Sequence, residues 1–221
     1  DWSSDVCSSD LIGGKICGWI EQWLHDREQR VVVNGQTSEW ARVSSGVPQG
    51  SVLGPTLFLM YINDIDERVT SGILKFADDT KIYTCVQTVE AAMILQEDLN
   101  RLCSWSKDWL MLFNVDKCKC LHFGFNNIEF EYMLGNDTIS SCLEEKDLGI
   151  TVHHSLQTSS HCANIVKKAN QVLGIIRRTY DDKSKENIVQ LYKSLVRPHL
   201  EYCVQAWRPY LQKDIDNIEK V

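Results

Sequence analysis

The spacing of the apolar residues changes at about residue 155, and this change limits the folds that the chain can adopt. Before it, segments with apolar residues at every second position alternate with segments that repeat every three or four residues. The first spacing is typical of half-buried strands and the second of amphipathic helices. After Ser155 only the helical spacing remains, in stripes from Ile165 to Ile176 and from Ile188 to Val196. The sequence therefore predicts an α/β (α+β) body at residues 12–155 and a helical module at residues 156–221.

Turn and cap residues divide the body into predicted elements. Asn34-Gly35 suits the type I′ turn of a β-hairpin, and Pro55 suits the first turn of a helix that reaches about Arg68. Thr88 is a candidate N-cap for a helix that reaches about Trp109. The predicted elements are a helix from Gly13, a hairpin at 30–43, a loop at 44–55, a helix to about 68, a hairpin at 73–86, a helix at 89–109, strands near 117–123, 128–134 and 148–152, and a last short helix after Pro209.

Composition bears on partners and compartment. The net charge of the 221 residues is −7, which by itself disfavours a nucleic-acid binder. Residues 1–159 carry a net −11 and residues 160–221 a net +4, which fits a metal-using site beside a phosphate-binding one and equally fits ordinary surface variation. Nine cysteines without a repeating frame argue against a disulfide scaffold. We expect an intracellular protein (cytoplasm and nucleus) with reduced thiols, no signal peptide and no transmembrane segment.

The stretch LKFADDTKIY (74–83) places two adjacent carboxylates, Asp78 and Asp79, at the tip of a predicted hairpin. Adjacent like charges repel each other unless a cation neutralises them. Mg²⁺ ions would do so, since they bind a few carboxylates together with water and substrate phosphates, and metal pairs of this kind promote phosphoryl transfer. A solvated turn is the alternative. A second pair, Asp181-Asp182, is assigned to a solvated loop between helices.

The loop SSGVPQGSVLGP (44–55) is the second candidate element. Its three glycines recur every four residues beside Pro48, and the loop leads directly into a helix. Glycine allows a backbone to approach a ligand closely, and the first turn of a helix favours phosphate. Gln49 could hydrogen-bond to a sugar or to a base edge. The loop is not a P-loop, because no Gly-Lys-Ser/Thr ends it, and a simple connector is the alternative.

The order of these pieces resembles the reverse transcriptase of non-LTR (LINE-type, Jockey-like) retrotransposons over residues 13–221. The matching segments are SGVPQGSVLGPTLFLMYINDI (45–65, similar to motif B), KFADDTKIY (75–83, motif C), WSKDWLMLFNVDKCKCLHFG (105–124, motif D), EEKDLGITV (144–152, primer-grip region), and KKANQVLGIIRRTY (167–180) with LYKSLVRPHLEYCVQAWRPYL (191–211), similar to the thumb. The resemblance implies a polymerase palm with an antiparallel sheet and packed helices, followed by a helical thumb.

The resemblance also implies a reaction: nucleotidyl transfer from a dNTP to the 3′-OH of a DNA primer on an RNA template. Two Mg²⁺ ions, for which Mn²⁺ can substitute, would be bound by Asp78 and Asp79, with Asp78 the more important ligand. Gln49, Gly50 and Ala77 would lie at the incoming nucleotide and the primer end.

Further basic residues take roles from the same resemblance. Lys117 would be the motif D lysine that protonates the leaving pyrophosphate; Lys119 competes for this role, and a turn lysine beside a strand is the alternative. A basic set on the predicted thumb helix would hold the template-primer backbone by charge, with a solvated helix face as the alternative. This set is Lys167, Lys168, Arg177 and Arg178.

One segment departs from the family pattern. The family's first metal-binding Asp lies on a strand before the helix that begins near Gly13, where this chain has DWSSDVCSSDL (1–11). We expect that segment to be artefactual or unrelated sequence, and assign no role to Asp5 or Asp10. The expectation is a fragment: a partial palm at 12–155 with motifs B to E and without motif A, a thumb at 156–221, an element-encoded endonuclease domain upstream, and no activity in this chain alone.

Other readings stay open. A decayed, non-catalytic remnant that at most binds nucleic acid, or a group II intron-type maturase palm, would share these motifs. Cys118, Cys120 and His122 alternate along a predicted strand without zinc-ligand spacing and are assigned to packing of one strand face. A further set without ligand spacing is assigned to polar loop groups: His153, His154, His161 and Cys162.

Overall fold

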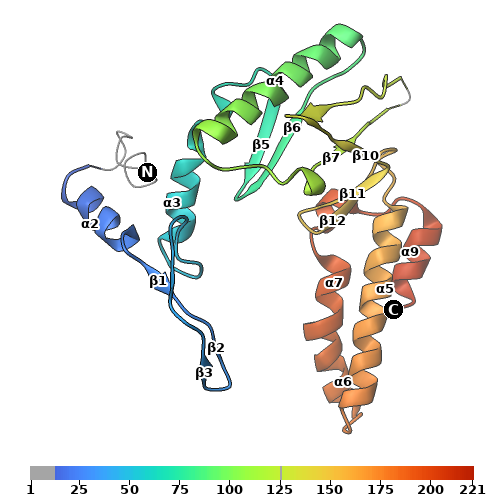
Figure 1. Cartoon of the computed structure of the whole chain (residues 1–221). Helices are drawn as coiled ribbons and strands as arrows, with labels where there is room; N and C mark the ends of the chain where they lie inside the picture. Colours follow the sequence, from blue (N-terminus) through green and yellow to red (C-terminus); the bar gives the residue numbers. More distant parts are fainter. Residues whose placement is uncertain (1–12, 125) are drawn as a thin grey trace. The chain divides into compact units, whose positions relative to one another are not determined.

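The computed structural model describes residues 13–124 and 126–221, and these form two compact units of mixed helix and strand (Figure 1). The described part of unit 1 comprises residues 13–85 and 93–112, and unit 2 comprises residues 86–92 and 113–221. The mixed α/β class is confirmed. The units divide the chain at other points than residue 155, because strand β12 (Ile150–His153) packs against helix α5 (Ser159–Thr179). The functional division into palm and thumb stays a prediction. The segment 1–11 lies outside the described residues.

Unit 1 begins with helix α2 (Lys15–Leu24), which confirms the first predicted helix. The predicted hairpin follows as two short ladders: β1 (Glu28–Gln29) pairs with β4 (Ala41–Arg42), and β2 (Val32–Val33) pairs with β3 (Gln36–Thr37). Asn34 and Gly35 form its turn with φ of 49° and 79°, the positive values that a type I′ turn requires.

Helix α3 (Gly54–Tyr61) has Pro55 in its first turn, as predicted, but it ends before Arg68. A 3₁₀ turn (Asn63–Asp66) follows, because Asn and Asp side chains compete with the helical backbone hydrogen bonds. Strands β5 (Gly72–Phe76) and β6 (Asp79–Tyr83) then form the second predicted hairpin. Helix α4 (Val89–Asp108) begins where Thr88 Oγ1 accepts a hydrogen bond from the N–H of Ala91, which confirms the predicted cap.

Most of the large buried side chains of unit 1 lie on α3, the 3₁₀ turn and α4. Trp105 is completely buried, and its Nε1 donates to Asp64 Oδ1 at 3.0 Å. The Tyr61 hydroxyl donates to the carbonyl of Trp109, and the two rings meet edge to face. The buried apolar residues of this group are Leu57, Tyr61, Ile62, Ile65, Leu95, Leu99, Leu102 and Trp105.

The strands of unit 2 lie between residues 119 and 153 and are short. Strand β7 (Lys119–Leu121) pairs in parallel with β10 (Ser140–Cys142), β8 (Met133–Leu134) pairs with β9 (Asp137–Thr138), and β11 (Glu144–Asp147) pairs with β12. The described strands therefore form separate two-stranded ladders, where one antiparallel sheet was expected for the palm. Strands β9, β10 and β11 were not predicted, because they are short and polar and lack an alternating apolar pattern.

The rest of unit 2 is helical, as predicted. Helix α5 packs against α7 (Arg197–Glu201) and α9 (Gln212–Glu219) (Figure 1). Helix α6 (Lys185–Leu191) continues through a π turn (Tyr192–Val196) into α7, and α8 (Val204–Trp207) precedes α9. The π turn has a local cause: Pro198 lacks an N–H, and its ring would clash with the carbonyl of Ser194 in a regular α-helix. The core of these helices contains Cys162, Ile165, Ala169, Ile176, Val196, Leu200 and Trp207.

The assignment of His161 and Cys162 to polar loop groups is wrong. Both lie on α5 and are almost completely buried, at 3% and 1% exposure. His161 Nδ1 accepts a hydrogen bond from the N–H of Thr151 at 3.1 Å. Burial lowers the pKa of His161, which favours the neutral ring that this bond requires.

Within residues 13–124 and 126–221, no helix combines the length and the apolar character needed to cross a bilayer.

Candidate functional site

The two adjacent carboxylates lie at the end of the β5–β6 hairpin. Phe76 pairs with Asp79, so Ala77 and Asp78 form a two-residue turn and Asp79 is the first residue of β6. Both aspartates are exposed, and neither forms an ion pair with a described residue. The hairpin thus presents two carboxylates to solvent at a defined position.

One face of the β5–β6 hairpin contacts the rest of unit 1, and the other face is open. Ile73 pairs with Ile82 on the contacting face, and Lys75 Nζ donates to Asp66 Oδ1 at 2.7 Å and to the carbonyl of Asn63 at 2.9 Å. The hydrogen bond from Lys75 lowers the pKa of Asp66. Side chains on the opposite face, which includes Asp79, are largely exposed: Leu74, Phe76 and Tyr83. Lys75 therefore ties the hairpin to the 3₁₀ turn while the carboxylate face stays open.

The start of the hairpin is fixed by Asp98 of α4, a residue that the sequence analysis did not select. Asp98 is completely buried. Its carboxylate accepts hydrogen bonds from the N–H and hydroxyl of Thr70 (2.9–3.1 Å) and from the N–H of Ser71 (2.8 Å), and it pairs with Arg101 at 3.0 Å. Burial raises the pKa of Asp98, but the hydrogen bonds from Ser71 and Thr70 outweigh burial, and the pKa lies below its ordinary value.

The turn itself is strained. Ala77 has φ of 51°, whereas Asp78 has a negative φ. Positive φ at the first turn residue alone is the pattern of a type II′ turn, where glycine is the usual residue. A non-glycine residue in this region costs about 1–2 kcal/mol, and such strain persists only where the surroundings impose it.

Replacing Ala77 with glycine should therefore stabilise unit 1. We expect the free energy of unfolding to rise by about 0.5–1 kcal/mol, because glycine removes the steric strain but adds freedom to the unfolded chain. Urea unfolding measures the change. Asn34→Gly in the other hairpin is the control, and its free energy of unfolding should rise less, since asparagine tolerates positive φ. An unchanged or lowered stability of Ala77→Gly would show that the turn is unstrained.

The loop at 44–55 ends in a tight turn. The N–H of Ser51 donates to the carbonyl of Pro48 at 3.2 Å, and Gly50 has φ of 83°, which together describe a type II-like turn. Ser51 Oγ accepts from the N–H of Gly54 at 3.0 Å. A Cβ on Gly54 would lie 2.8 Å from this hydroxyl, so glycine is required there for close packing. Gln49 and Gly50 are exposed at the tip of the turn.

Carboxylate oxygens suit hard cations such as Mg²⁺, so Asp78 and Asp79 fit a divalent metal by donor type. Among the described residues, no three His, Cys, Asp or Glu side chains converge to hold an ion. The two carboxylates therefore provide only part of a coordination shell, which substrate phosphates and water would have to extend.

Lys117 and Lys119 lie in unit 2. Lys117 is exposed at the end of a 3₁₀ turn (Val115–Lys117). Lys119 is on β7, and its Nζ donates to Ser140 Oγ at 2.8 Å. Lys117 is thus the less engaged of the two side chains, and its role as a proton donor stays a prediction.

The four basic residues expected on a helix all lie on α5 and are exposed: Lys167, Lys168, Arg177 and Arg178. Helix α5 contains no Asp or Glu, and none of the four pairs with a described acidic group. Helix α5 therefore has an uncompensated charge of +4.

Of the alternating residues near β7, Cys120 and His122 contact each other, whereas the Cys118 thiol donates to the carbonyl of Asn114 at 3.3 Å. Cys120 Sγ lies 3.5 Å from His122 Nε2, and His122 contacts Asn127 Oδ1 and Ser141 Oγ at 3.2 Å each. Burial, with Cys142 nearby, raises the pKa of Cys120 to about 11, which disfavours the thiolate that a metal requires. The described contacts fit the predicted packing role.

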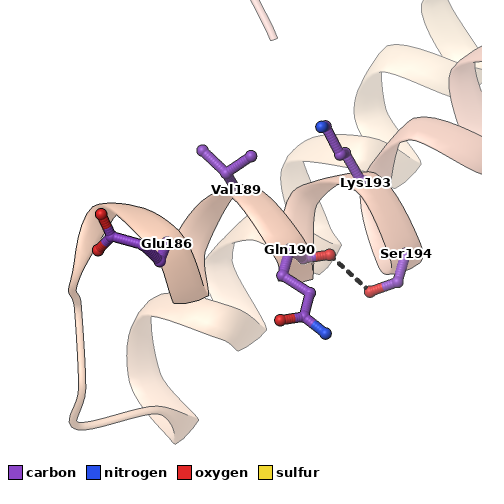
Figure 2. A pocket seen from close by; sticks show the side chains of 5 residues that line it. All are labelled: Glu186, Val189, Gln190, Lys193 and Ser194. Atoms are coloured by element: carbon purple, nitrogen blue, oxygen red, sulfur yellow. Dashed lines mark hydrogen bonds between the residues drawn. The ribbon is translucent and has the colours of Figure 1, made fainter.

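A shallow hollow lies on the outer face of α6 and the π turn (Figure 2). It is lined by Glu186, Val189, Gln190, Lys193 and Ser194, and Ser194 Oγ donates to the carbonyl of Gln190 at 2.9 Å. No residue predicted for the site lines this hollow.

Comparison with known proteins gives a consistent result. A family model described as reverse transcriptase (RNA-dependent DNA polymerase) matches residues 6–176. The RNA-directed DNA polymerase from mobile element jockey of Drosophila melanogaster is 30% identical over 202 residues, which cover 85% of this chain and 22% of that protein. The jockey protein of Drosophila funebris is 27% identical over 221 residues, covering 90% of this chain and 23% of the relative.

The probable RNA-directed DNA polymerase from transposon BS of Drosophila melanogaster is 29% identical over 210 residues (86% of this chain, 23% of the relative). The chain thus spans between a fifth and a quarter of the length of these relatives. The family match begins within the segment 1–11.

Proposed function

This chain belongs to the reverse transcriptase (RNA-dependent DNA polymerase) family, and from that premise we propose that it is part of the RNA-directed DNA polymerase of a mobile element. The reaction is transfer of a nucleotide from a dNTP to the 3′-OH of a DNA primer on an RNA template. The observation that carries the proposal is the β5–β6 hairpin, which exposes Asp78 and Asp79 to solvent while Lys75 fixes the hairpin to Asp66 of the 3₁₀ turn.

Asp78 and Asp79 would hold the metal ions. When bound, two divalent cations would neutralise the attacking and leaving oxygens of the phosphoryl transfer. The protein's part is to keep the two carboxylates in place. Lys75 and Asp98 serve this purpose, since they tie the hairpin to the 3₁₀ turn and to α4. Mg²⁺ is the expected ion and Mn²⁺ a substitute.

Other residues would position the substrates. Gln49 and Gly50, exposed at the tip of the loop, would contact the incoming dNTP and the templating base, and the small Ala77 would leave room for the primer end. Lys117 would protonate the leaving pyrophosphate. In this proposal residues 12–155 form the palm and residues 156–221 the thumb, an intracellular location is expected, and an endonuclease domain precedes the palm.

Primer extension tests the proposal. The polypeptide encoded by the whole reading frame is purified and incubated with an RNA template, an annealed DNA primer, dNTPs and Mg²⁺. We expect the primer to lengthen, and lengthening to stop when EDTA removes the metal. A polypeptide that binds the template-primer but incorporates no nucleotide with Mg²⁺ or Mn²⁺ would contradict the proposal.

The basic face of α5 yields a separate prediction. Reversing the charge of Lys167, Lys168, Arg177 and Arg178 to Glu should weaken binding of an RNA–DNA duplex and flatten its salt dependence. If all four contact phosphates, the slope of log K against log salt should become shallower by about 3–4, because each contact releases about one counterion. Fluorescence anisotropy at several salt concentrations measures the slope.

The control for this prediction reverses four exposed lysines outside α5: Lys183, Lys185, Lys213 and Lys220. Their reversal changes the net charge equally but should change the slope much less. Equal slopes for the wild type and the α5 variant would mean that this helix face is only solvated.

A further inference from the structure

Arg27 lies at a junction in unit 1 between α2, the β1–β4 hairpin and the loop at 44–55. Its Nε donates to the carbonyl of Leu24 at 2.9 Å, at the end of α2. Its Nη2 donates to the carbonyl of Gly46, nineteen residues away in the loop. Its own carbonyl accepts from the N–H of Val43 at 2.8 Å, at the base of the hairpin. The half-buried side chain of Arg27 thus joins the end of α2 to the loop, and its backbone carbonyl adds the bond to the hairpin.

The part of the loop that follows Gly46 is held by contacts with α2 and α3. Val47 packs against the buried side chains of Ile20 and Leu57, and the Pro48–Ser51 turn is closed by a backbone hydrogen bond and joined to α3 by the hydroxyl of Ser51. The contact between Arg27 and Gly46 is therefore the polar anchor upstream of Gln49 and Gly50, and the Ser51 hydroxyl is the anchor downstream of them.

An arginine is required for this arrangement on geometric grounds. The guanidinium presents several N–H donors in a rigid fork, so it can bind two carbonyls that belong to different segments. A lysine ammonium is a single point donor on a flexible stem and would hold one segment less firmly. The acceptor is also special, because Gly46 has φ of 76°, a conformation that other residues adopt only at a cost.

We propose that Arg27 is a positioning residue that sets the place of Gln49 and Gly50 by holding the carbonyl of Gly46. The effect on the loop rests on geometry alone. The consequence for nucleotide binding rests on the proposed function, in which Gln49 and Gly50 contact the incoming dNTP and the templating base. A misplaced contact of this kind costs up to about a hundredfold in rate or affinity per ångström.

The experiment compares Arg27→Ala, Arg27→Lys and Gly46→Ala with the wild type in the polypeptide of the whole reading frame. Hydrogen exchange of the Ser51 and Gly54 amides reports the turn, because both N–H groups are bonded within it. Exchange of the Ser38 amide, bonded to Val31, reports the hairpin. Primer extension gives KM for dNTP and kcat separately, and Tm reports the overall fold.

Arg42→Ala is the matched control. Arg42 is also at the base of the hairpin, but it pairs with Asp26 and both side chains are more than 70% exposed. We expect Arg42→Ala to match the wild type in loop exchange and KM. Arg27→Ala should speed exchange of Ser51 and Gly54 and raise KM for dNTP by about tenfold or more, with kcat and Ser38 exchange little changed. Arg27→Lys should recover part of the loss, and Gly46→Ala should act in the same direction.

The outcomes separate this proposal from the proposed function. Wild-type loop exchange in Arg27→Ala overturns the positioning role. If hydrogen exchange of the loop amides is faster in Arg27→Ala but KM for dNTP is unchanged, in a polypeptide that extends primers, the link to nucleotide binding is overturned. If the wild type extends no primer, the proposed function fails, and loop exchange alone then upholds or overturns the positioning role. If Arg27→Ala does not fold, Arg27→Lys and Gly46→Ala decide the same question by the same measurements.

Discussion

Asp78→Asn should abolish nearly all nucleotide incorporation by the full polypeptide. The substitution keeps the size of the side chain but removes one of the two negative charges at the hairpin tip. Metal ions supply several kcal/mol of transition-state stabilisation, and a loss of about 4 kcal/mol corresponds to a fall of about a thousandfold in rate. Primer extension at saturating dNTP measures the loss, and a raised Mg²⁺ requirement should accompany any residual activity.

Asp181→Asn is the matched control, since Asp181-Asp182 is the other adjacent pair in the chain and lies exposed between α5 and α6. The control should retain full activity. Because Asp78 is exposed, its substitution should leave the stability of unit 1 almost unchanged, so a fall in activity cannot be attributed to unfolding. Wild-type incorporation by Asp78→Asn would refute the metal-binding role of the hairpin tip.

The largest effect on stability is expected at Asp98. Asp98→Asn removes the charge of a completely buried carboxylate. It also replaces one of the two acceptor oxygens by an NH₂ group, which cannot accept the hydrogen bonds that Thr70 and Ser71 donate. Breaking a buried, hydrogen-bonded charge typically costs about 3–5 kcal/mol. We therefore expect the free energy of unfolding of unit 1 to fall by about 3 kcal/mol. Urea unfolding, followed by Trp fluorescence, measures it.

Glu97→Gln is the control for Asp98, because Glu97 also faces Arg101 but at 3.8 Å and with its side chain 58% exposed. Exposed pairs of this kind contribute less than about 1 kcal/mol, so the control should stay close to the wild type. A comparable loss of stability in both variants would show that Asp98 stabilises unit 1 through its ion pair with Arg101 and not through its hydrogen bonds with Thr70 and Ser71.

The lowered pKa of Asp98 fixes the sign of a pH effect. The unfolded chain binds a proton near the ordinary value of 3.8, whereas the folded chain does so only at lower pH. The stabilisation by Asp98 is therefore fully present above the ordinary value and is lost as pH falls through the folded pKa. Wild-type unit 1 should lose stability in this acid range more steeply than Asp98→Asn, which lacks the titrating group.

Several elements could be predicted because their causes are local. The Asn34-Gly35 turn, the Thr88 cap and the place of Pro55 in the first turn of α3 each depend on residues within about four positions, and the structure contains all three. The apolar stripe of α5 likewise predicted which side would be buried, because a helical period is visible in any single segment. The stripe from Ile188 to Val196 did so only in part, since Val196 is buried but Leu195 is 41% exposed. The order of the loop, helix and Asp-Asp hairpin was enough to indicate the family.

The supports of the candidate site could not be predicted in this way. Asp98 stands beside Glu97 and Arg101 in a charged helical segment and reads as a solvated residue, yet its partners are Thr70 and Ser71. Arg27 stands among other charged residues, and its second acceptor is Gly46. The same holds outside the site for His161, which has no ligand spacing and whose partner is Thr151 on a strand. None of these pairings leaves a periodic signal.

The sequence by itself determined the family, the two carboxylates, the exposed loop tip and most helices, because turn propensity, capping and hydrophobic period act over short distances along the chain. Only the tertiary structure decided which charged residues are buried and which segments they join. The physical reason is that burial and hydrogen-bond partnership arise when segments far apart in sequence pack together, and a buried charge is stable only where those segments supply its donors.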